Sequence, residues 1–162
     1  MKISYTDMHE FQCWRPYWRV IRLSKVSILV VDDTAFWREL VASTVENESS
    51  LEIICEVVDG LQAVRMAAHF QPTIALLDIG LPRMSGIDAA KRIRTLAPQT
   101  KILFLSEQRD LEVIEAALNV ACGYVLKSDA AKDLIPAIHS VAAGKPFVSS
   151  QLGGLSLEAK GC

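Results

Sequence analysis

Five short apolar runs, each followed by a longer segment with helical spacing, constrain the fold of this chain more than any other feature. The runs are rich in Val, Ile and Leu and show little of the alternation expected of a strand with one face in water. They are Val26–Val31, Leu51–Val58, Thr73–Leu77, Lys101–Leu105 and Gly123–Leu126. Such runs between amphipathic segments are typical of a parallel sheet covered by helices on both faces.

The segments between the runs carry apolar residues at helical spacing. In Ala35–Glu46, for example, Phe36, Leu40, Val41 and Val45 share one stripe. The other expected helices are Leu61–Phe70, Ile87–Leu96, Leu111–Val120 and Ala131–Ala143. A strand followed by a helix, five times over, predicts a doubly wound (βα)5 α/β fold with a five-stranded parallel sheet.

Length and charge favour one compact domain with a separate leader. The 162 residues are about half apolar, enough for one core, and the net charge is −2. Residues 1–25 carry +3 and the remainder about −5, and an acidic body argues against direct nucleic-acid binding. We expect an N-terminal extension over 1–25, a domain over 26–145 and a C-terminal tail or linker over 146–162.

The cysteines and the absence of a long apolar run indicate a cytoplasmic protein. Cys13, Cys55, Cys122 and Cys162 form no CxxC pair, and we interpret them as reduced thiols. No run reaches the roughly 18 apolar residues of a membrane span. The sequence therefore predicts a protein that neither crosses nor binds a membrane.

The leader contains aromatic residues at helical spacing beside arginines, as in Trp14, Trp18 and Arg15. A surface helix that binds a partner or a membrane is one interpretation. There are two other interpretations: the leader packs on the domain, or it is a stretch translated from a misplaced start. We favour these two, taken together, over the first.

Charged and polar residues follow four of the five predicted strands. Asp32 and Asp33 follow the first strand, Asp78 the third, Ser106 the fourth and Lys127 the fifth. In an open parallel sheet, ligands bind outside the carboxyl ends of the strands, where the strand order reverses. We therefore expect three carboxylates, a hydroxyl and an ammonium group at one edge.

These residue types suit phosphoryl transfer to a carboxylate. Three adjacent carboxylates repel one another, which raises their pKa values unless a cation is bound. Oxygen ligands are typical of Mg²⁺, which is commonly held by one or two carboxylates and phosphate oxygens. A lysine, a hydroxyl and a metal ion would surround the phosphoryl group with charge and donors, and Asp78 would be the nucleophile.

Each of these residues also has an ordinary structural explanation. The pair Asp32 and Asp33 could cap the next helix, Lys127 could be solvated, and Asp78 could be a turn residue. That explanation needs a coincidence at the ends of four strands. Taken together, the residues therefore favour a site.

Four motifs resemble those of the receiver domain of two-component response regulators. They are VVDD at 30–33, LLDIGLPRMSG at 76–86, LFLS at 103–106 and GYVLKS at 123–128. They occur in the family's order at the expected strands, and the resemblance covers about residues 26–145. It implies a flavodoxin-like fold and a cytoplasmic phosphoprotein of phosphorelay signal transduction.

The resemblance implies a role for each residue of the acidic edge. Asp78 matches the phosphoacceptor, Asp33 a direct Mg²⁺ ligand, and Asp32 a ligand that acts mainly through water. Gly80 matches the position whose backbone carbonyl also reaches the metal. Mg²⁺ is thus the implied cofactor.

The remaining implied roles concern switching and partners. Lys127 matches the lysine that pairs with the phosphoryl group, Ser106 the switch hydroxyl, and Tyr124 an aromatic that changes rotamer, although an aromatic residue in a strand can simply pack. The family receives phosphate from a histidine kinase or a phosphotransfer protein. The face of the fourth helix, fifth strand and fifth helix reports the state to a downstream protein.

The stretch Asp133–Leu152, DLIPAIHSVAAGKPFVSSQL, resembles the end of receivers of the NarL/LuxR-type group. Those proteins usually continue into a DNA-binding helix-turn-helix, which does not follow here. Either the protein is a stand-alone receiver that works through protein contacts, including those of a weak homodimer, or it is a transcription regulator whose output domain is absent from this chain. Both remain open.

Two rival functions use the same residues. One is an Mg²⁺-dependent phosphohydrolase with an aspartyl nucleophile, but those enzymes resemble DxDx[TV], and here Ile79 and Gly80 follow Asp78. The other is a degenerate receiver used only for interaction, against which the complete residue set argues. We therefore expect a signalling domain that accepts and slowly loses phosphate, and no enzyme with an external substrate.

Overall fold

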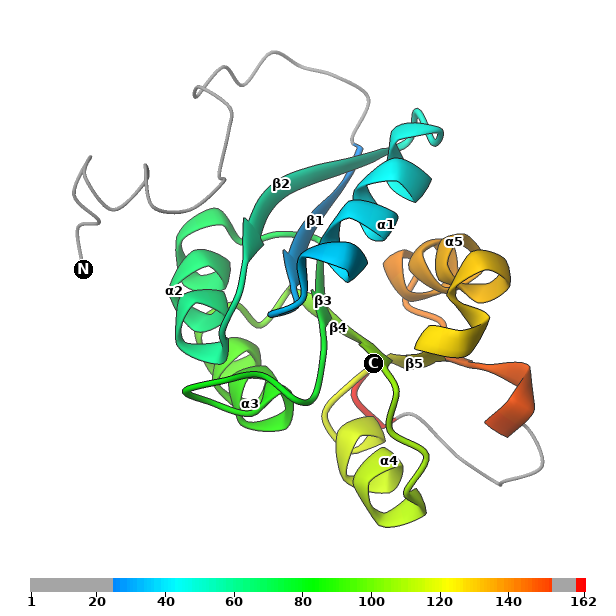
Figure 1. The fold of residues 1–162 in the computed structure, drawn as a ribbon. Helices are drawn as coiled ribbons and strands as arrows, with labels where there is room; N and C mark the ends of the chain where they lie inside the picture. Colours follow the sequence, from blue (N-terminus) through cyan, green and yellow to red (C-terminus); the bar gives the residue numbers. More distant parts are fainter. Residues whose placement is uncertain (1–24, 153–159) are drawn as a thin grey trace.

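The computed structural model describes residues 25–152 and 160–162, which form a parallel sheet between two layers of helices (Figure 1). Within these residues the sheet has six strands in the order β2-β1-β3-β4-β5-β6. The strands are β1 (Val26–Val31), β2 (Leu51–Val57), β3 (Ile74–Leu77), β4 (Lys101–Ser106), β5 (Gly123–Leu126) and β6 (Phe147–Val148). The helices are α1 (Ala35–Glu46), α2 (Gly60–Phe70), α3 (Gly86–Leu96), α4 (Leu111–Leu118) and α5 (Ala130–Ala142), with short 3-10 turns at Lys127–Asp129 and Ser150–Leu152.

The strand order reverses at β1. The chain runs from β1 outward to β2 and then returns to the other side of β1 to form β3. Val31 consequently pairs with Val57 on one side and with Leu77 on the other. The carboxyl ends of β1 and β3 therefore lie side by side at the point where an α/β sheet opens a crevice.

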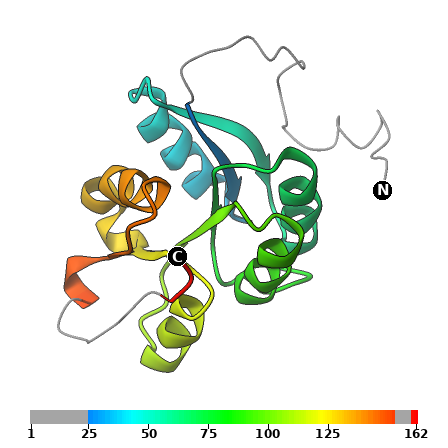
Figure 2. The same ribbon diagram turned by 180° about the vertical axis from the view of Figure 1, so that it is seen from behind.

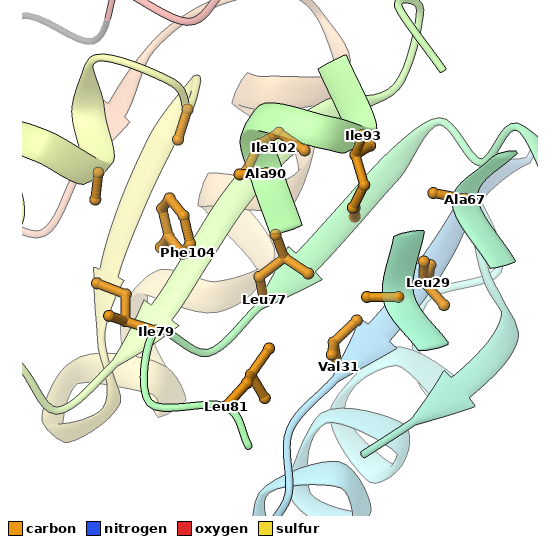
Figure 3. Packing of buried hydrophobic residues seen from close by; sticks show 14 of the residues in the cluster. Leu29, Val31, Ala67, Leu77, Ile79, Leu81, Ala90, Ile93, Ile102 and Phe104 are labelled. Atoms are coloured by element: carbon orange, nitrogen blue, oxygen red, sulfur yellow. The ribbon is translucent and has the colours of Figure 1, made fainter. Parts of the chain in front are cut away.

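Two apolar cores sandwich the sheet because successive strand residues point to opposite faces. Leu29 and Val31 of β1 belong to the core under α2, α3 and α4, part of which is drawn in Figure 3. Ile28 and Val30 belong to the core under α1 and α5. Figures 1 and 2 show α2 with α3 on one side of the sheet and α1 with α5 on the other.

The predicted parallel α/β fold is confirmed, and element bounds shift by one or two residues. All five predicted strands and all five predicted helices are present, and β4 extends to include Ser106. The sixth strand, β6, was not predicted. It has only two residues, Phe147 and Val148, and follows Pro146, so its sequence resembles the start of a loop. It pairs with Gly123 and Tyr124 of β5.

The prediction of reduced cysteines is wrong for the part of the chain that the structure describes. Cys122, at the start of β5, forms a disulfide with Cys162, and no described cysteine is free. The backbone N–H of Gly161 donates to the carbonyl of Ala121 at 3.2 Å, which brings the last residues beside β5. Forty residues separate the two cysteines, so spacing alone gave no signal for the pair.

The structure describes the leader only at Lys25 and the predicted tail only at 146–152 and 160–162. The amphipathic stretch around Trp14 and Trp18 lies outside the described residues, as does 153–159. Residues 147–152 pack onto the domain, where Leu152 is buried. Among the described residues, no helix is long and apolar enough to cross a membrane.

Candidate functional site

The two aspartates after β1 have different surroundings. Asp32 is buried, and its Oδ1 accepts a hydrogen bond from the backbone N–H of Thr34 at 2.9 Å. Asp33 is exposed, and the Thr34 hydroxyl donates to its carboxylate at 3.3 Å. The Asp33 carboxylate is therefore the more accessible of the two to an ion from solvent.

Asp78 follows β3 beside this pair. Its backbone N–H donates to the carbonyl of Val31 at 2.9 Å, which extends the pairing of β1 with β3, and its Oδ2 accepts from the backbone N–H of Gly80 at 3.2 Å. The helix after the loop approaches closely at Gly86, where a Cβ atom would lie 1.9 Å from the carbonyl oxygen of Asp78. Glycine at 86 is thus needed for the loop to fold back under Asp78.

Lys127 connects the acidic residues from the other side of the crevice. Its Nζ lies 2.7 Å from Oδ2 of Asp32 and 3.6 Å from Oδ1 of Asp78. Its side chain is only 5 % exposed, and that of Asp78 is 12 % exposed. The structure thus brings together, largely out of water, three of the side chains predicted to form the site.

The surroundings of Asp78 disfavour its negative charge. Burial raises the pKa of the Asp78 carboxyl, and the nearby negative charge of Asp32 adds to that increase. The positive charge of Lys127 and a side-chain hydrogen bond with Ser106 lower the pKa, but they do not cancel the effect of burial. A bound cation would relieve this imbalance.

Ser106 is buried at the end of β4, and its hydroxyl accepts a hydrogen bond from the backbone N–H of Gln108 at 3.4 Å. Its side chain lowers the pKa values of both Asp78 and Tyr124. Tyr124 is fully buried in β5, and its hydroxyl donates to the carbonyl of Gln108 at 2.9 Å. Burial raises the pKa of the Tyr124 hydroxyl to about 12. Both predicted switch residues therefore lie in one connected path from Asp78 to the β4–α4 loop.

An aromatic ring contacts Lys127, and the sequence did not predict this contact. The Nζ of Lys127 lies 4.9 Å from the centroid of the Trp37 ring, in the first turn of α1. Trp37 and Lys127 also line a hollow of about 300 Å³. Its position, four residues after Asp33, places Trp37 in the helix that follows the acidic pair, but position alone does not predict the contact with Lys127.

The chemistry of the site fits Mg²⁺. Carboxylates from Asp32, Asp33 and Asp78 and the carbonyl of Gly80 are hard oxygen ligands of the kind this ion prefers. Among the described residues, no three His, Cys, Asp or Glu side chains are grouped closely enough to hold a metal by themselves. Mg²⁺ commonly takes only one or two carboxylates and completes its shell with water and phosphate oxygens, so no such cage is required.

Comparison with known proteins agrees with this geometry. The model of the response regulator receiver domain matches residues 28–139. Over 126 residues the chain is 31% identical to transcriptional regulatory protein DegU of Brevibacillus brevis, covering 77% of this chain and 53% of the relative. Over 133 residues it is 31% identical to transcriptional regulatory protein LiaR of Bacillus subtilis, covering 80% and 62%. The chain thus spans between about half and three-fifths of these relatives.

A solved structure supports the same assignment. A two-component response regulator of the LuxR family from Aurantimonas sp. SI85-9A1 superposes with a TM-score of 0.76 at 28% sequence identity. The superposition covers 81% of this chain and 94% of that chain. The likeness therefore extends over most of both chains.

Proposed function

The chain belongs to the response regulator receiver family, and on that premise we propose that Asp78 is its phosphoacceptor. The donor is the phosphohistidine of a histidine kinase or of a phosphotransfer protein. The observation that carries the proposal is the placement of Lys127, whose ammonium nitrogen lies 2.7 Å from Asp32 and 3.6 Å from Asp78. Asp78 thus has a fixed positive charge beside it in a largely buried position.

The transfer is a displacement at phosphorus. An oxygen of the Asp78 carboxylate forms a bond to phosphorus while the bond from phosphorus to the donor's imidazole nitrogen breaks and its electron pair leaves with the imidazole. Lys127 stays protonated and stabilises the negative charge on the phosphoryl oxygens. Ser106 donates a hydrogen bond to one of these oxygens.

We assign the Mg²⁺ site to the same residues. Asp33 and Asp78 would be direct ligands with the backbone carbonyl of Gly80, and Asp32, held by Lys127 and Thr34, would act mainly through water. The ion supplies positive charge that offsets the repulsion between the carboxylates and the phosphoryl group.

The output is a change in a protein-binding face. Receivers of this family interact with histidine kinases and output domains. The face formed by α4, β5 and α5 is the proposed reporter here, since Tyr124 belongs to β5 and bonds to the loop before α4. It would bind a downstream protein or a second copy in a weak homodimer, without contacting nucleic acid or membrane directly.

A signalling role accounts for the site better than an enzymatic one. The match to relatives that are methylesterases covers only a part of those proteins, 29% of the length of one of them. Gly80 stands where an aspartyl phosphohydrolase of the DxD type has its second carboxylate. We therefore propose a cytoplasmic receiver that accepts and slowly loses phosphate without turning over an external substrate. Its domain extends beyond the expected bounds of 26–145 to include β6 and the turn at Ser150–Leu152.

Labelling by a small acyl phosphate tests the proposal. Incubation with acetyl phosphate and Mg²⁺ should add one group of about 80 Da, detected by intact mass spectrometry. Asp78→Asn should abolish the addition, because the nucleophilic carboxylate is gone. The matched control is Asp88→Asn, which replaces an exposed aspartate at the start of α3 and should label as the wild type does. Undiminished labelling of Asp78→Asn would refute the assignment.

A further inference from the structure

We propose that Trp37 is a positioning residue for Lys127, which holds the ammonium group beside Asp78 through the face of its indole ring. The inference rests on the proposed function, because this placement matters chemically only if Asp78 takes up a phosphoryl group. Trp37 acts through Lys127 and makes no bond to the phosphoryl group.

The contact joins the first helix to the end of the fifth strand. Trp37 is the third residue of α1, and Lys127 directly follows β5. The distance of 4.9 Å from Nζ to the ring centroid is within the roughly 6 Å over which a cation is attracted to an aromatic face. The ammonium group therefore has three neighbours, namely the carboxylates of Asp32 and Asp78 and one neutral ring.

Burial strengthens the attraction to the ring. The Lys127 side chain is only 5 % exposed, so little water competes for its charge. Trp37 and Lys127 both line the hollow of about 300 Å³. Without the indole, water in that space would compete with Asp78 for the ammonium protons.

A neutral ring suits this position better than a further anion. A carboxylate in place of Trp37 would bind Lys127 as Asp32 does and would repel the incoming phosphoryl group. The indole attracts the ammonium group without neutralising it, so the full positive charge stays available to the phosphoryl oxygens. Trp37 should therefore speed phosphoryl transfer more than it affects binding of the donor.

Packing is the competing explanation for any effect of Trp37. The side chain also packs against the core under α1 and α5, so its removal alters packing as well as charge. Fluorinated tryptophans separate the two effects, because fluorine withdraws electron density from the ring face and changes its size little. The series is made in a Trp14→Phe, Trp18→Phe chain, in which Trp37 is the only tryptophan left.

The experiment measures the rate constant for labelling as a function of acetyl phosphate concentration at fixed Mg²⁺. We expect Trp37→Leu to lower the limiting rate constant about fivefold, with a smaller loss in Trp37→Phe, which keeps an aromatic face. The rate should fall steadily from tryptophan to its trifluoro derivative. Leu96→Ala is the control and should keep the wild-type rate, since this exposed apolar side chain lies at the end of α3 and does not line the hollow. A constant rate across the fluorinated series would overturn the proposal.

Failure of this inference differs from failure of the proposed function. A wild-type chain that labels normally, with no dependence on fluorine, leaves Asp78 as acceptor and removes only the role of Trp37. A wild-type chain that does not label at all overturns both. A second measurement needs no phosphoryl donor: the ring current of Trp37 should shift the Lys127 Cε proton resonances upfield, and Trp37→Leu should abolish that shift. Absence of the shift in the wild type would also refute the contact.

Discussion

The two ends of the sheet both contain partly or fully buried polar side chains, but they use them differently. At the amino end, the Ser27 and Thr73 hydroxyls lie 3.1 Å apart, and Thr100 donates to the carbonyl of Pro72 at 2.7 Å. At the carboxyl end, Asp32 and Asp78 are charged and share Lys127. The amino end thus consists of neutral, paired groups, and the carboxyl end of charges that burial disfavours.

The comparison shows which end of the sheet stabilises the fold and which end destabilises it. A buried neutral hydrogen bond contributes modestly to stability, and leaving one partner unpaired is costly. Buried like charges oppose folding, and such groups are typical of functional sites. The same parallel backbone therefore presents a stabilising end and a reactive end, and four experiments can test that division.

The largest expected effect is an opposite change in stability at the two ends. Thr100→Val should lower the free energy of unfolding by about 1–3 kcal/mol, because it leaves the buried carbonyl of Pro72 without its donor. Asp78→Asn should raise it by about 1 kcal/mol, because it removes a buried charge next to Asp32. Urea unfolding at neutral pH in EDTA measures both. Destabilisation by both variants would contradict the proposed difference between the two ends of the sheet.

The increase in the free energy of unfolding that Asp78→Asn causes should depend on pH in a defined direction. In the folded protein the pKa of Asp78 lies above its ordinary value of 3.8, so the folded state binds the proton more tightly than the unfolded chain does. This proton binding stabilises the fold fully below pH 3.8, and the stabilisation is lost as pH rises through the raised pKa. The advantage of the variant should therefore be largest at neutral pH and should shrink as pH falls toward 4. An advantage that does not change with pH would indicate a cause other than charge.

A smaller effect is expected on metal affinity. Asp33→Asn should weaken Mg²⁺ binding by about tenfold, and Asp32→Asn by less, because Asp33 is exposed while Asp32 is held by Lys127 and Thr34. Titration of tryptophan fluorescence in the chain that keeps only Trp37 reports binding. The amino-end variant Thr100→Val should bind Mg²⁺ as the wild type does. Equal losses from the two aspartate variants would contradict the ranking.

The smallest expected effect is a shift in a two-state population. Beryllofluoride with Mg²⁺ should change NMR shifts in residues 109–120 and at Tyr124, since Ser106 and Tyr124 both form hydrogen bonds with the backbone of Gln108 in the loop before α4. A small difference in interaction free energy between the two states biases such an equilibrium without locking it. Ser106→Ala should confine the changes to loops beside Asp78, whereas Ser27→Ala at the amino end should leave them intact. Identical spectra for the wild type and Ser106→Ala would show that the signal takes another route.

The sequence allowed prediction of the elements with strong periodicity and of the residues at their ends. β3 is a continuous apolar run and β1 is interrupted only by Ser27, and position after a strand was enough to place Asp32, Asp78 and Lys127 at one edge. The roles of these residues came from the family resemblance and stay proposals, because position does not specify a reaction.

Features that depend on tertiary structure could not be predicted. β6 forms because the chain after α5 passes β5, and two residues give no periodicity to detect. The Cys122–Cys162 disulfide depends on where the last residues lie. The contact of Trp37 with Lys127 depends on the crossing of α1 over the sheet, which fixes the direction of the ring and which spacing along the chain does not reveal.

The shortest strand has a consequence for the solubility of the domain. An open sheet presents unpaired N–H and C=O groups at its outer strands, where another chain can add and start aggregation. β6 covers the side of β5, and just beyond it the backbone N–H of Ser149 donates to the Tyr124 carbonyl at 3.0 Å, while the Leu126 N–H donates to the Ser149 hydroxyl at 3.0 Å. β5, whose four residues are all buried, is therefore an inner strand. Residues 147–149 thus protect the chain from intermolecular strand pairing along the strand that carries Tyr124.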